Sequence, residues 1–251
     1  MVYWIWLMQI PGVGAVTRWK LIQHFMDAKN VYLASENELR ENCSLSQKQL
    51  DSIVSYRTLE EAKRIYENCQ KLGIRVLTVQ DEQYPLKAQN GNDVPVLLFY
   101  KGNMKKIGKT IGVVGARRCT QDDKNFTRIF TRGHVENGEI IVSGMAKGVD
   151  SYAHTACIEA GGYTIAVLAN GLDICYPPEH QLLMERICEN GLLLSEYPPG
   201  TKPARYNFPR RNRIISAWSD SLAVIAPGKN SGAFITAQIS RSMGREVVVY
   251  G

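Results

Sequence analysis

IIVSGMAKGVD, residues 140–150, is the stretch that decides the fold. Three branched apolar residues lead into a loop that contains Gly144 and Gly148, and the loop opens into a helical pattern at Asp150. A continuous apolar run is typical of a strand buried on both faces, and a strand followed by a short loop and a helix is half of a βαβ unit. The stretch therefore predicts a parallel sheet covered by helices.

The same alternation continues through the rest of the chain from Gly73 onward. Short β-branched runs alternate with windows of helical periodicity, which predicts a doubly wound, mostly parallel sheet of the α/β class. Ligands of such sheets bind outside the carboxyl ends of the strands. The other predicted strands are residues 74–79, 96–100, 110–114, 164–168, 192–194, 222–225 and 246–250, and the predicted helices are residues 122–136, 150–159, 179–189, 212–217 and 233–243.

The first part of the chain has a different pattern. Residues 1–71 carry apolar side chains at helical spacing. Residues 10–15 (IPGVGA) predict a tight turn before a helix that begins near Thr17, an arrangement that resembles a helix-hairpin-helix. Backbone N–H groups at such a helix start can receive a phosphate, although a plain helix–helix turn explains the same residues equally well. We predict a helical domain over residues 1–72 and a sheet domain over residues 73–251.

The composition is that of an ordinary soluble globular protein, with 45% hydrophobic and 22% charged residues. Its six cysteines are scattered and form no CxxC pair. We therefore expect reduced thiols in a cytoplasmic protein, with no disulfide scaffold and no zinc knuckle. The apolar residues 1–10 are too few to span a membrane and lack the basic residues of a secretory signal, so we expect no membrane association.

The positive charge gathers near the C-terminal end. Residues 197–251 contain eight Lys and Arg against two Asp and Glu, whereas residues 1–196 contain 22 of each, so the formal excess of +6 lies in the last fifth. Within it, residues 205–213 (RYNFPRRNR) interleave four arginines with Tyr206 and Phe208. Guanidinium groups bind phosphates and aromatic faces stack on unpaired bases, which favours single-stranded nucleic acid over the alternative of a solvated basic loop.

Glycine and polar residues follow the predicted strands where a ligand is expected. Ser143 and Gly144, and likewise Ser231 and Gly232, stand between a strand and a helix and are candidate phosphate receivers. Arg117, after another strand, is the candidate charged clamp. Each glycine alone could simply make a sharp turn, but four such loops at one sheet edge favour an anion-binding crevice.

The specific fingerprints of nucleotide enzymes are absent. The sequence has no GxxxxGK[ST] loop, and the turn after residues 110–114 lacks the GxGxxG spacing. Asp150 and His154 stand four residues apart, which we interpret as a local structural bond because no nucleophile and oxyanion hole accompany them. We predict no catalytic residue, no metal and no cofactor.

Seven motifs then occur in order from about Thr110 to the end of the chain. Together they make the sequence resemble the DNA-processing protein A family (DprA, also called Smf), and the IPGVG turn agrees with the small sterile-alpha-motif-like or helix-hairpin-helix region of that family. The motifs are GARR (115–118), SGMAKGVDSYAH (143–154), TIAVLANGLDICYP (164–177), LLSEYPPGTKP (193–203), FPRRNRIIS (208–216), SGAFITA (231–237) and GREV (244–247).

The resemblance implies a non-catalytic protein with an extended Rossmann-like fold. It implies binding and protection of incoming single-stranded DNA during natural transformation, loading of the RecA recombinase, and a homodimer formed through the Rossmann-like domain. Asn212 and Arg213, at a predicted helix start, could instead cap the helix and brace the crevice. The DNA-binding residues that the motifs imply are Arg117, Ser143, Gly144, Lys147, Asn170, Gly171, Arg205, Phe208, Arg211, Asn212 and Arg213.

The chain departs from the family pattern in places. Ala226 stands where a glutamate is usual, Pro178 where lysine is frequent, and Tyr250 where proline precedes the last glycine. We expect the common C-terminal winged-helix-like module to be absent. Two alternatives stay open, a nucleotide phosphoribohydrolase-like enzyme and a dimeric nucleotide-sensing Rossmann module. The enzyme group needs a PGGxGT loop, and the spacing of Gly228 and Gly232 does not match that loop.

Overall fold

The structure is a computed structural model that describes residues 1–228 and 231–251. Residues 1–72, all of them described, form helices only, as the sequence predicts. Ser35 and Ser46 each make a capping box at the start of a helix, with Glu38 and Gln49 as the reciprocal partners. The helices are α1 (Val2–Gln9), α2 (Ala15–Phe25), α3 (Ala28–Leu33), α4 (Glu36–Asn42), α5 (Gln47–Ser55) and α6 (Glu60–Lys71).

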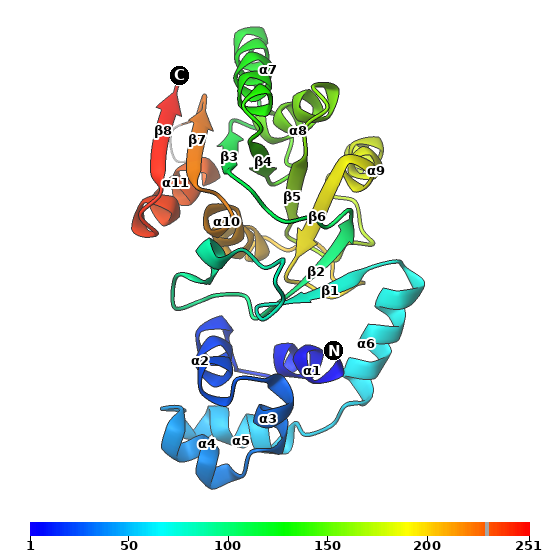
Figure 1. Cartoon of the computed structure of the whole chain (residues 1–251), viewed down its shortest axis with the longest axis vertical. Coiled ribbons are helices and arrows are strands. Elements are labelled where there is room, and N and C mark those ends of the chain that lie inside the picture. The colour runs from blue at the N-terminus through cyan, green and yellow to red at the C-terminus, as the bar shows by residue number, and fades with distance from the viewer. Residues whose placement is uncertain (229–230) are drawn as a thin grey trace.

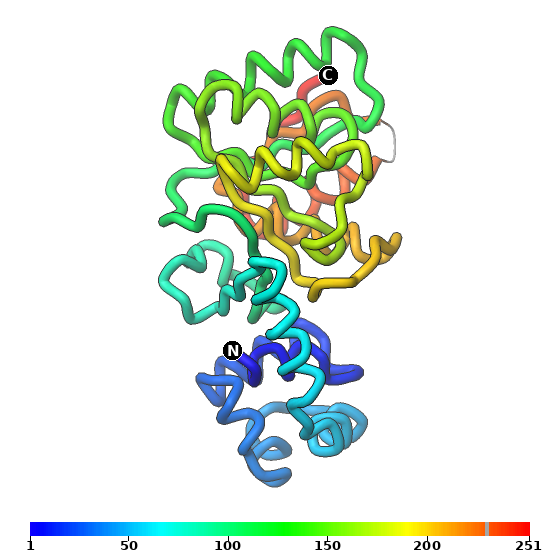
Figure 2. Tube along the Cα trace, turned by 90° about the vertical axis from the view of Figure 1, so that its right-hand side faces the viewer, coloured from blue at the N-terminus to red at the C-terminus, as the bar shows by residue number. Residues whose placement is uncertain are grey.

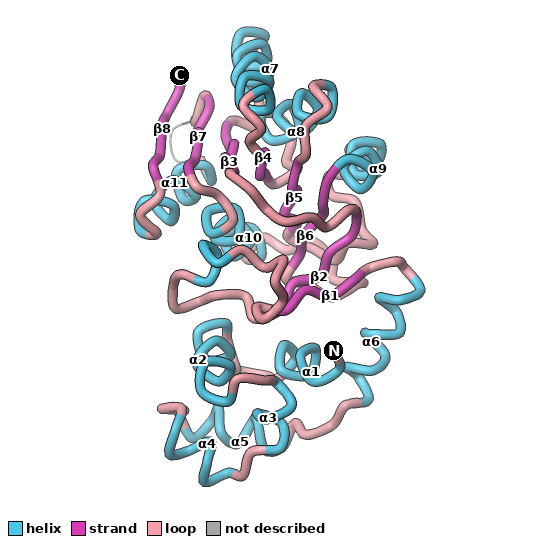
Figure 3. The backbone as a smooth tube through the Cα atoms, in the orientation of Figure 1, coloured by secondary structure: helices cyan, strands magenta, loops and turns pink. Residues whose placement is uncertain are grey.

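The remaining described residues form an eight-stranded sheet, shown in magenta in Figure 3, in the order β1-β2-β6-β5-β4-β3-β7-β8. The six strands from β6 to β8 in this order pair in parallel, whereas β1 and β2 pair antiparallel at one edge. The doubly wound, mostly parallel prediction is confirmed. The strands are β1 (Arg75–Thr78), β2 (Leu97–Gly102), β3 (Thr110–Gly115), β4 (Ile140–Ser143), β5 (Thr164–Leu168), β6 (Gly191–Ser195), β7 (Ser221–Ile225) and β8 (Glu246–Tyr250).

Helices cover both faces of this sheet (Figure 1). On one face lie α7 (Gln121–Glu136), α8 (Val149–Glu159) and α9 (Gln181–Asn190), and on the other lie α10 (Asn207–Ala217) and α11 (Gly232–Ser242). Two short 3-10 turns complete the described elements, η1 (Leu86–Gln89) and η2 (Pro178–His180). The helical N-terminal part sits at one end of the long axis, and α6 leads from it into the sheet, as Figure 2 shows.

One boundary differs from the prediction in a way that affects the site. Helix α10 begins at Asn207, five residues before the predicted start at Asn212. Pro209 lies in its first turn, where the missing N–H has no partner within the helix in any case, so proline is tolerated. The basic aromatic segment is therefore largely helical, and its side chains point to different sides instead of facing one way from a loop.

The core is continuous between the N-terminal helices and the sheet. Buried residues of both parts, from Trp6 and Leu39 to Leu194 and Trp218, belong to a single hydrophobic cluster. A second cluster fills the space between α8 and the strands β3, β4 and β7. Because the two parts share one core, the domain boundary at residues 72–73 stays a prediction. No helix among the described residues has the length and apolar character that crossing a membrane requires.

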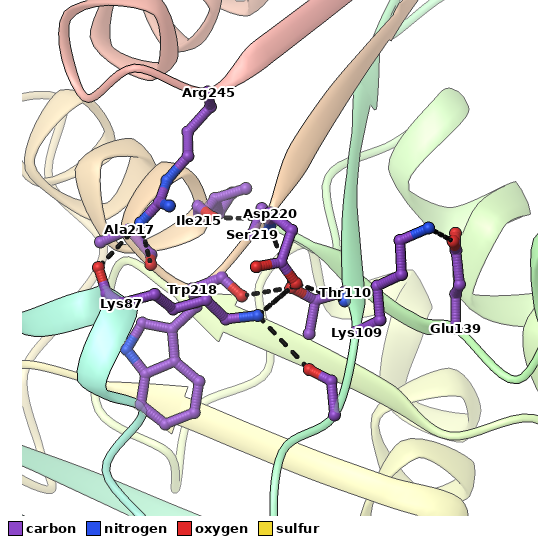
Figure 4. A network of polar contacts seen from close by, with 11 residues as sticks. Lys87, Lys109, Thr110, Glu139, Ile215, Ala217, Trp218, Ser219, Asp220 and Arg245 are labelled. Atoms are coloured by element: carbon purple, nitrogen blue, oxygen red, sulfur yellow. Dashed lines mark hydrogen bonds and ion pairs between the residues drawn. The ribbon is translucent and has the colours of Figure 1, made fainter.

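A polar network ties the amino ends of β3 and β7 to η1, as Figure 4 shows. The Lys87 ammonium donates to the Thr110 hydroxyl (2.8 Å) and pairs with the Asp220 carboxylate, which also accepts the Thr110 backbone N–H (2.8 Å). Arg245 donates to the carbonyl of Lys87 (2.7 Å). These bonds fix the sheet at the end opposite to the loops considered next.

Candidate nucleic-acid interface

The carboxyl ends of the parallel strands open into a groove of about 410 Å³. Its walls come from the loop after β3, the first turns of α10 and the start of α11. A smaller pocket of about 70 Å³ adjoins it and shares Arg117, Phe208 and Arg211 as lining residues. We call the groove and this pocket together the crevice, and it lies where a doubly wound sheet is expected to bind ligands.

An aromatic wall with an exposed cation stands at the centre of the crevice. The Phe208 ring is half-buried, and the ring of Tyr176, which is 41% exposed, lies 5.8 Å from it between centroids. The Arg117 guanidinium carbon lies 5.8 Å from the Phe208 centroid. Within the described part of the chain Arg117 has no ion pair, so its charge and hydrogen-bond donors are available to a ligand.

The loop after β4 already holds an anion of its own, the carboxylate of Asp150. This carboxylate accepts the backbone N–H groups of Gly144 (3.1 Å) and Ala146 (3.4 Å). Ser143 is buried, and its hydroxyl donates to the carbonyl of Val113 (2.6 Å). The donors that favoured Ser143 and Gly144 as phosphate receivers are thus used inside the protein, and their role in binding stays a prediction.

Arg211 supports the same loop through hydrogen bonds of its buried side chain. Its guanidinium is buried and donates through Nη1 to the carbonyls of Gly144 (2.5 Å) and Val167 (2.7 Å). Burial raises the pKa of Asp150, and the neighbouring Arg211 charge opposes that rise. A Cβ atom on Gly144 would lie 2.2 Å from Arg211 Nη1, so glycine is required here by the close approach of the arginine.

Asn212 and Arg213 support helix α10 in different ways. The side-chain oxygen of Asn212, which lines the groove, accepts Nε–H of Arg211 (3.0 Å). Arg213 is 9% exposed and donates through Nη2 to both carboxylate oxygens of Glu196 (2.6 Å each). Both contacts agree with the bracing alternative that the sequence allows for these two residues.

The turn after β5 is held by side-chain amides. Asn170, which lines the small pocket, is buried and donates to the carbonyls of Gly171 (2.9 Å) and Ile174 (2.7 Å). Gly171 donates its N–H to the carbonyl of Thr201 (2.9 Å). Asn207 reaches the same turn and donates to the carbonyl of Ala169 (3.0 Å), which joins the turn to the start of α10.

The remaining candidates lie around the rim. Lys147 is exposed and pairs with Glu179, and Arg205 is exposed with no partner among the residues that the structure describes. Ser231 and Gly232 line the groove at the start of α11. Lys229, a basic residue of the same loop, lies outside the described residues. The structure thus gathers Arg117, Phe208, Ser231 and Gly232 around open space.

Sequence reasoning missed a cation and an aromatic ring among the lining residues, and it misassigned one bond. Arg118 lines the groove beside Arg117, and Tyr176 lines the small pocket; the GARR and ICYP motifs contain them. His154 bonds Thr164 (2.7 Å) and not Asp150, so the expected Asp150–His154 bond is wrong. Burial lowers the pKa of His154 to about 3, which makes this histidine a neutral core residue.

The sequence is similar to those of several known proteins. Protein Smf of Synechocystis sp. is 37% identical over 250 residues, 98% of this chain and 63% of that protein, and DprA of Bacillus subtilis is 40% identical over 177 residues, 70% of this chain and 60% of that protein. The chain therefore spans about 60% of the length of these curated relatives.

Two solved structures have similar folds. DprA from Streptococcus pneumoniae superposes with a TM-score of 0.87 at 30% identity, over 99% of this chain and 86% of that one. DprA from Helicobacter pylori, described by its single-stranded DNA binding mode, superposes with a TM-score of 0.65 at 29% identity, over 70% and 80%. A family model, DNA recombination-mediator protein A, matches residues 75–251. With this match over well more than half of its length, the chain belongs to the DNA recombination-mediator protein A family.

Proposed function

We propose that this protein binds single-stranded DNA in the crevice, without catalysis, as a recombination mediator. The observation that carries the proposal is the exposed Arg117 guanidinium over the Phe208 ring at the carboxyl edge of the sheet. A guanidinium can hold a backbone phosphate while the adjacent ring stacks on an unpaired base, a combination that single strands offer and duplexes do not. The relative from Helicobacter pylori, described as binding single-stranded DNA, supports the same reading.

The chemistry of the crevice favours binding over catalysis. The buried Asp150 carboxylate accepts backbone N–H groups near the Arg211 charge, and His154 is neutral and bonded to Thr164. Among residues 1–228 and 231–251, no group of three His, Cys, Asp or Glu side chains could hold a metal ion. The described residues that line the groove therefore give the phosphoribohydrolase alternative no free acid or base, in addition to its missing PGGxGT spacing.

The crevice joins a small pocket to a larger groove. The enclosed pocket beside Phe208 is only about 70 Å³, whereas pockets for drug-sized ligands are about 300–1,000 Å³. The groove next to it is longer and open. This pair of spaces suits one base in the pocket with the backbone continuing along the groove.

The finer role extends this binding. The protein would protect incoming single strands in the cytoplasm during natural transformation and help to load RecA on them, as a homodimer. Exposed apolar side chains near the groove and on the edge strand suit such a dimer, and two crevices on one strand would raise the apparent affinity. They are Phe234 (37% exposed), Ile235 (44%), Val248 (38%) and Val249 (41%).

Fluorescence anisotropy of labelled oligo-dT and a matched duplex, titrated over a salt series, tests the proposal. With four to six phosphate contacts, we expect a slope of log affinity against log salt of about −3 to −4 on single strands. Arg117→Ala should weaken single-strand binding by about tenfold, or about 1.4 kcal/mol. The matched control is Arg64→Ala, an exposed arginine of α6 that pairs with Glu61. Preference for the duplex, or equal effects of the two variants, would contradict the proposal.

A further inference from the structure

A second basic space lies between the N-terminal helices and the sheet part, outside the crevice. This cleft has a volume of about 920 Å³. One wall is the turn between α1 and α2, and the other consists of the loop after β6 and residues of α10 and α11. The lining residues that bear charge are Arg18, Asp93, Glu196, Arg210 and Arg213.

The acidic residues of the cleft have Arg213 as their direct partner, and its five charged residues together leave the cleft a formal charge of +1. Arg213 donates to both carboxylate oxygens of Glu196 at 2.6 Å, and its Nε lies 3.7 Å from the Asp93 carboxylate. Two carboxylates therefore share one arginine as their direct partner. The cations that remain in the cleft are Arg18 and Arg210.

Arg18 is a guanidinium with poor compensation for its burial. It contacts the carbonyl and the sulfur of Met8, and its Nε is buried without a hydrogen-bond partner in the described structure. Burial lowers the pKa of Arg18 to about 10; Glu196 opposes this effect, and the charges of Arg213 and Arg210 add to it. An anion in the cleft would supply the counter-charge that Arg18 does not have in direct contact.

Arg210 and the start of α2 face the same space. Arg210 is exposed, and the described residues give its side chain no ion pair. Helix α2 begins at Ala15 with no side-chain cap and no acidic residue in its first turn, and Gly14 and Ala15 line the cleft. The helix start therefore adds favourable potential to that of the two arginines.

We propose that this cleft binds backbone phosphates of the same single strand after it leaves the crevice. Pro209 lines both the groove and the cleft, and Phe208 and Arg210 flank it in α10, so a strand that passes Phe208 reaches Arg210 on the other side of Pro209. The inference rests on the proposed function and extends its footprint to the N-terminal helices. It gives the IPGVG turn a nucleic-acid role through the cleft, with Arg18 as its principal cation.

The test compares oligo-dT lengths from about 4 to about 16 nucleotides by anisotropy. Arg18→Gln and Arg210→Gln should weaken binding of the long oligonucleotides by about tenfold and leave the shortest unchanged. Each should also reduce the salt slope on long strands by about 0.7. Because Arg210 is exposed, Arg210→Gln should not disturb folding, and it tests the proposal even if Arg18→Gln does. Arg64→Gln is the control that removes an arginine elsewhere.

The outcomes separate this inference from the proposed function. If Arg117→Ala weakens binding at every length while Arg18→Gln and Arg210→Gln have no effect at any length, the cleft proposal alone is overturned. No binding of any oligonucleotide by the wild type overturns both. The final comparison uses inorganic phosphate and a long oligonucleotide at equal phosphate concentration, and measures how well each protects Arg18 from an arginine-specific reagent. If inorganic phosphate protects Arg18 equally well, the cleft is a site for free phosphate and the strand proposal is wrong.

Discussion

Replacing Arg211 with methionine should lower the free energy of unfolding of the protein, whatever its effect on DNA binding. Its buried guanidinium donates to the carbonyls of Gly144 and Val167 and lies beside the buried Asp150 carboxylate. Methionine fills part of the same volume but leaves Asp150 without its opposite charge. It also leaves the two buried carbonyls without their donor, at about 1–3 kcal/mol each, so the total cost should be about 3–5 kcal/mol.

This cost is large enough to measure in two ways. For a chain of about this size, each kcal/mol shifts the midpoint of thermal unfolding by about 2–4 °C, so Arg211→Met should lower it by about 6–20 °C. Urea unfolding should give the same loss of free energy. Arg117→Ala, which removes an exposed charge at the same crevice, should change the free energy of unfolding by no more than about 0.5 kcal/mol.

A double variant identifies the cause of the loss. Arg211→Met combined with Asp150→Asn removes both charges, while the asparagine oxygen can still accept the N–H groups of Gly144 and Ala146. The double variant should therefore recover much of the stability that Arg211→Met alone loses. If Arg211→Met stays within about 1 kcal/mol of the wild type and nevertheless loses single-strand binding, Arg211 contacts DNA directly and the bracing argument is wrong.

Three further predictions concern the aromatic wall, the close approach and the polar network. Phe208→Ala should weaken single-strand binding by about 1–3 kcal/mol in anisotropy titrations and Phe208→Trp should retain it; equal binding by all three proteins would exclude stacking. Gly144→Ala should destabilise the protein by about 1–3 kcal/mol in urea, because its Cβ would meet Arg211; an unchanged midpoint would count against the rigid loop. Burial alone would raise the pKa of Asp220, but Lys87 and Thr110 hold that pKa below its ordinary value. Asp220→Asn should therefore cost about 1 kcal/mol at pH 7, and its difference from the wild type should shrink as pH falls below about 4; a difference constant down to acid pH would refute the ion pair.

The sheet could be predicted almost completely from the sequence. Strands buried on both faces must be continuously apolar, so runs such as residues 140–142, 164–168 and 222–225 carry a signal that few other structures produce. Every strand predicted in this way is present, with ends that differ by at most two residues. The signal is strong because burial on two faces leaves no position for a polar side chain to interrupt the run.

The start of α10 could not be predicted because its local signals conflict. Pro209 inside a helical window normally ends a helix, and only its place in the first turn makes it acceptable here. That place depends on Asn207, whose side chain is fixed by the carbonyl of Ala169, a contact between residues 38 positions apart. A contact of this range leaves no trace in a local pattern, so the helix appeared to begin only at Asn212.

The roles of the arginines were also beyond the sequence, for an electrostatic reason. A count of charges gives residues 197–251 a formal excess of +6, as if every arginine faced a polyanion. In the fold, Arg211 lies beside Asp150 and Arg213 pairs with Glu196, both acidic residues that precede this segment in the chain.

The positive surface of the crevice, its rim and the adjoining cleft therefore combines unpaired cations from two parts of the chain. Arg117 and Arg118 come from the segment whose net charge is zero, and Arg205 and Arg210 from the basic one; the described residues form no ion pair with any of these four. Because an unpaired cation releases counterions from DNA when it binds a phosphate, the salt dependence should follow these four arginines together with Arg18 of the cleft, and not the formal charge of the segment. Charge counted along the chain indicates that a polyanion is the partner, and pairing in three dimensions decides which cations bind it.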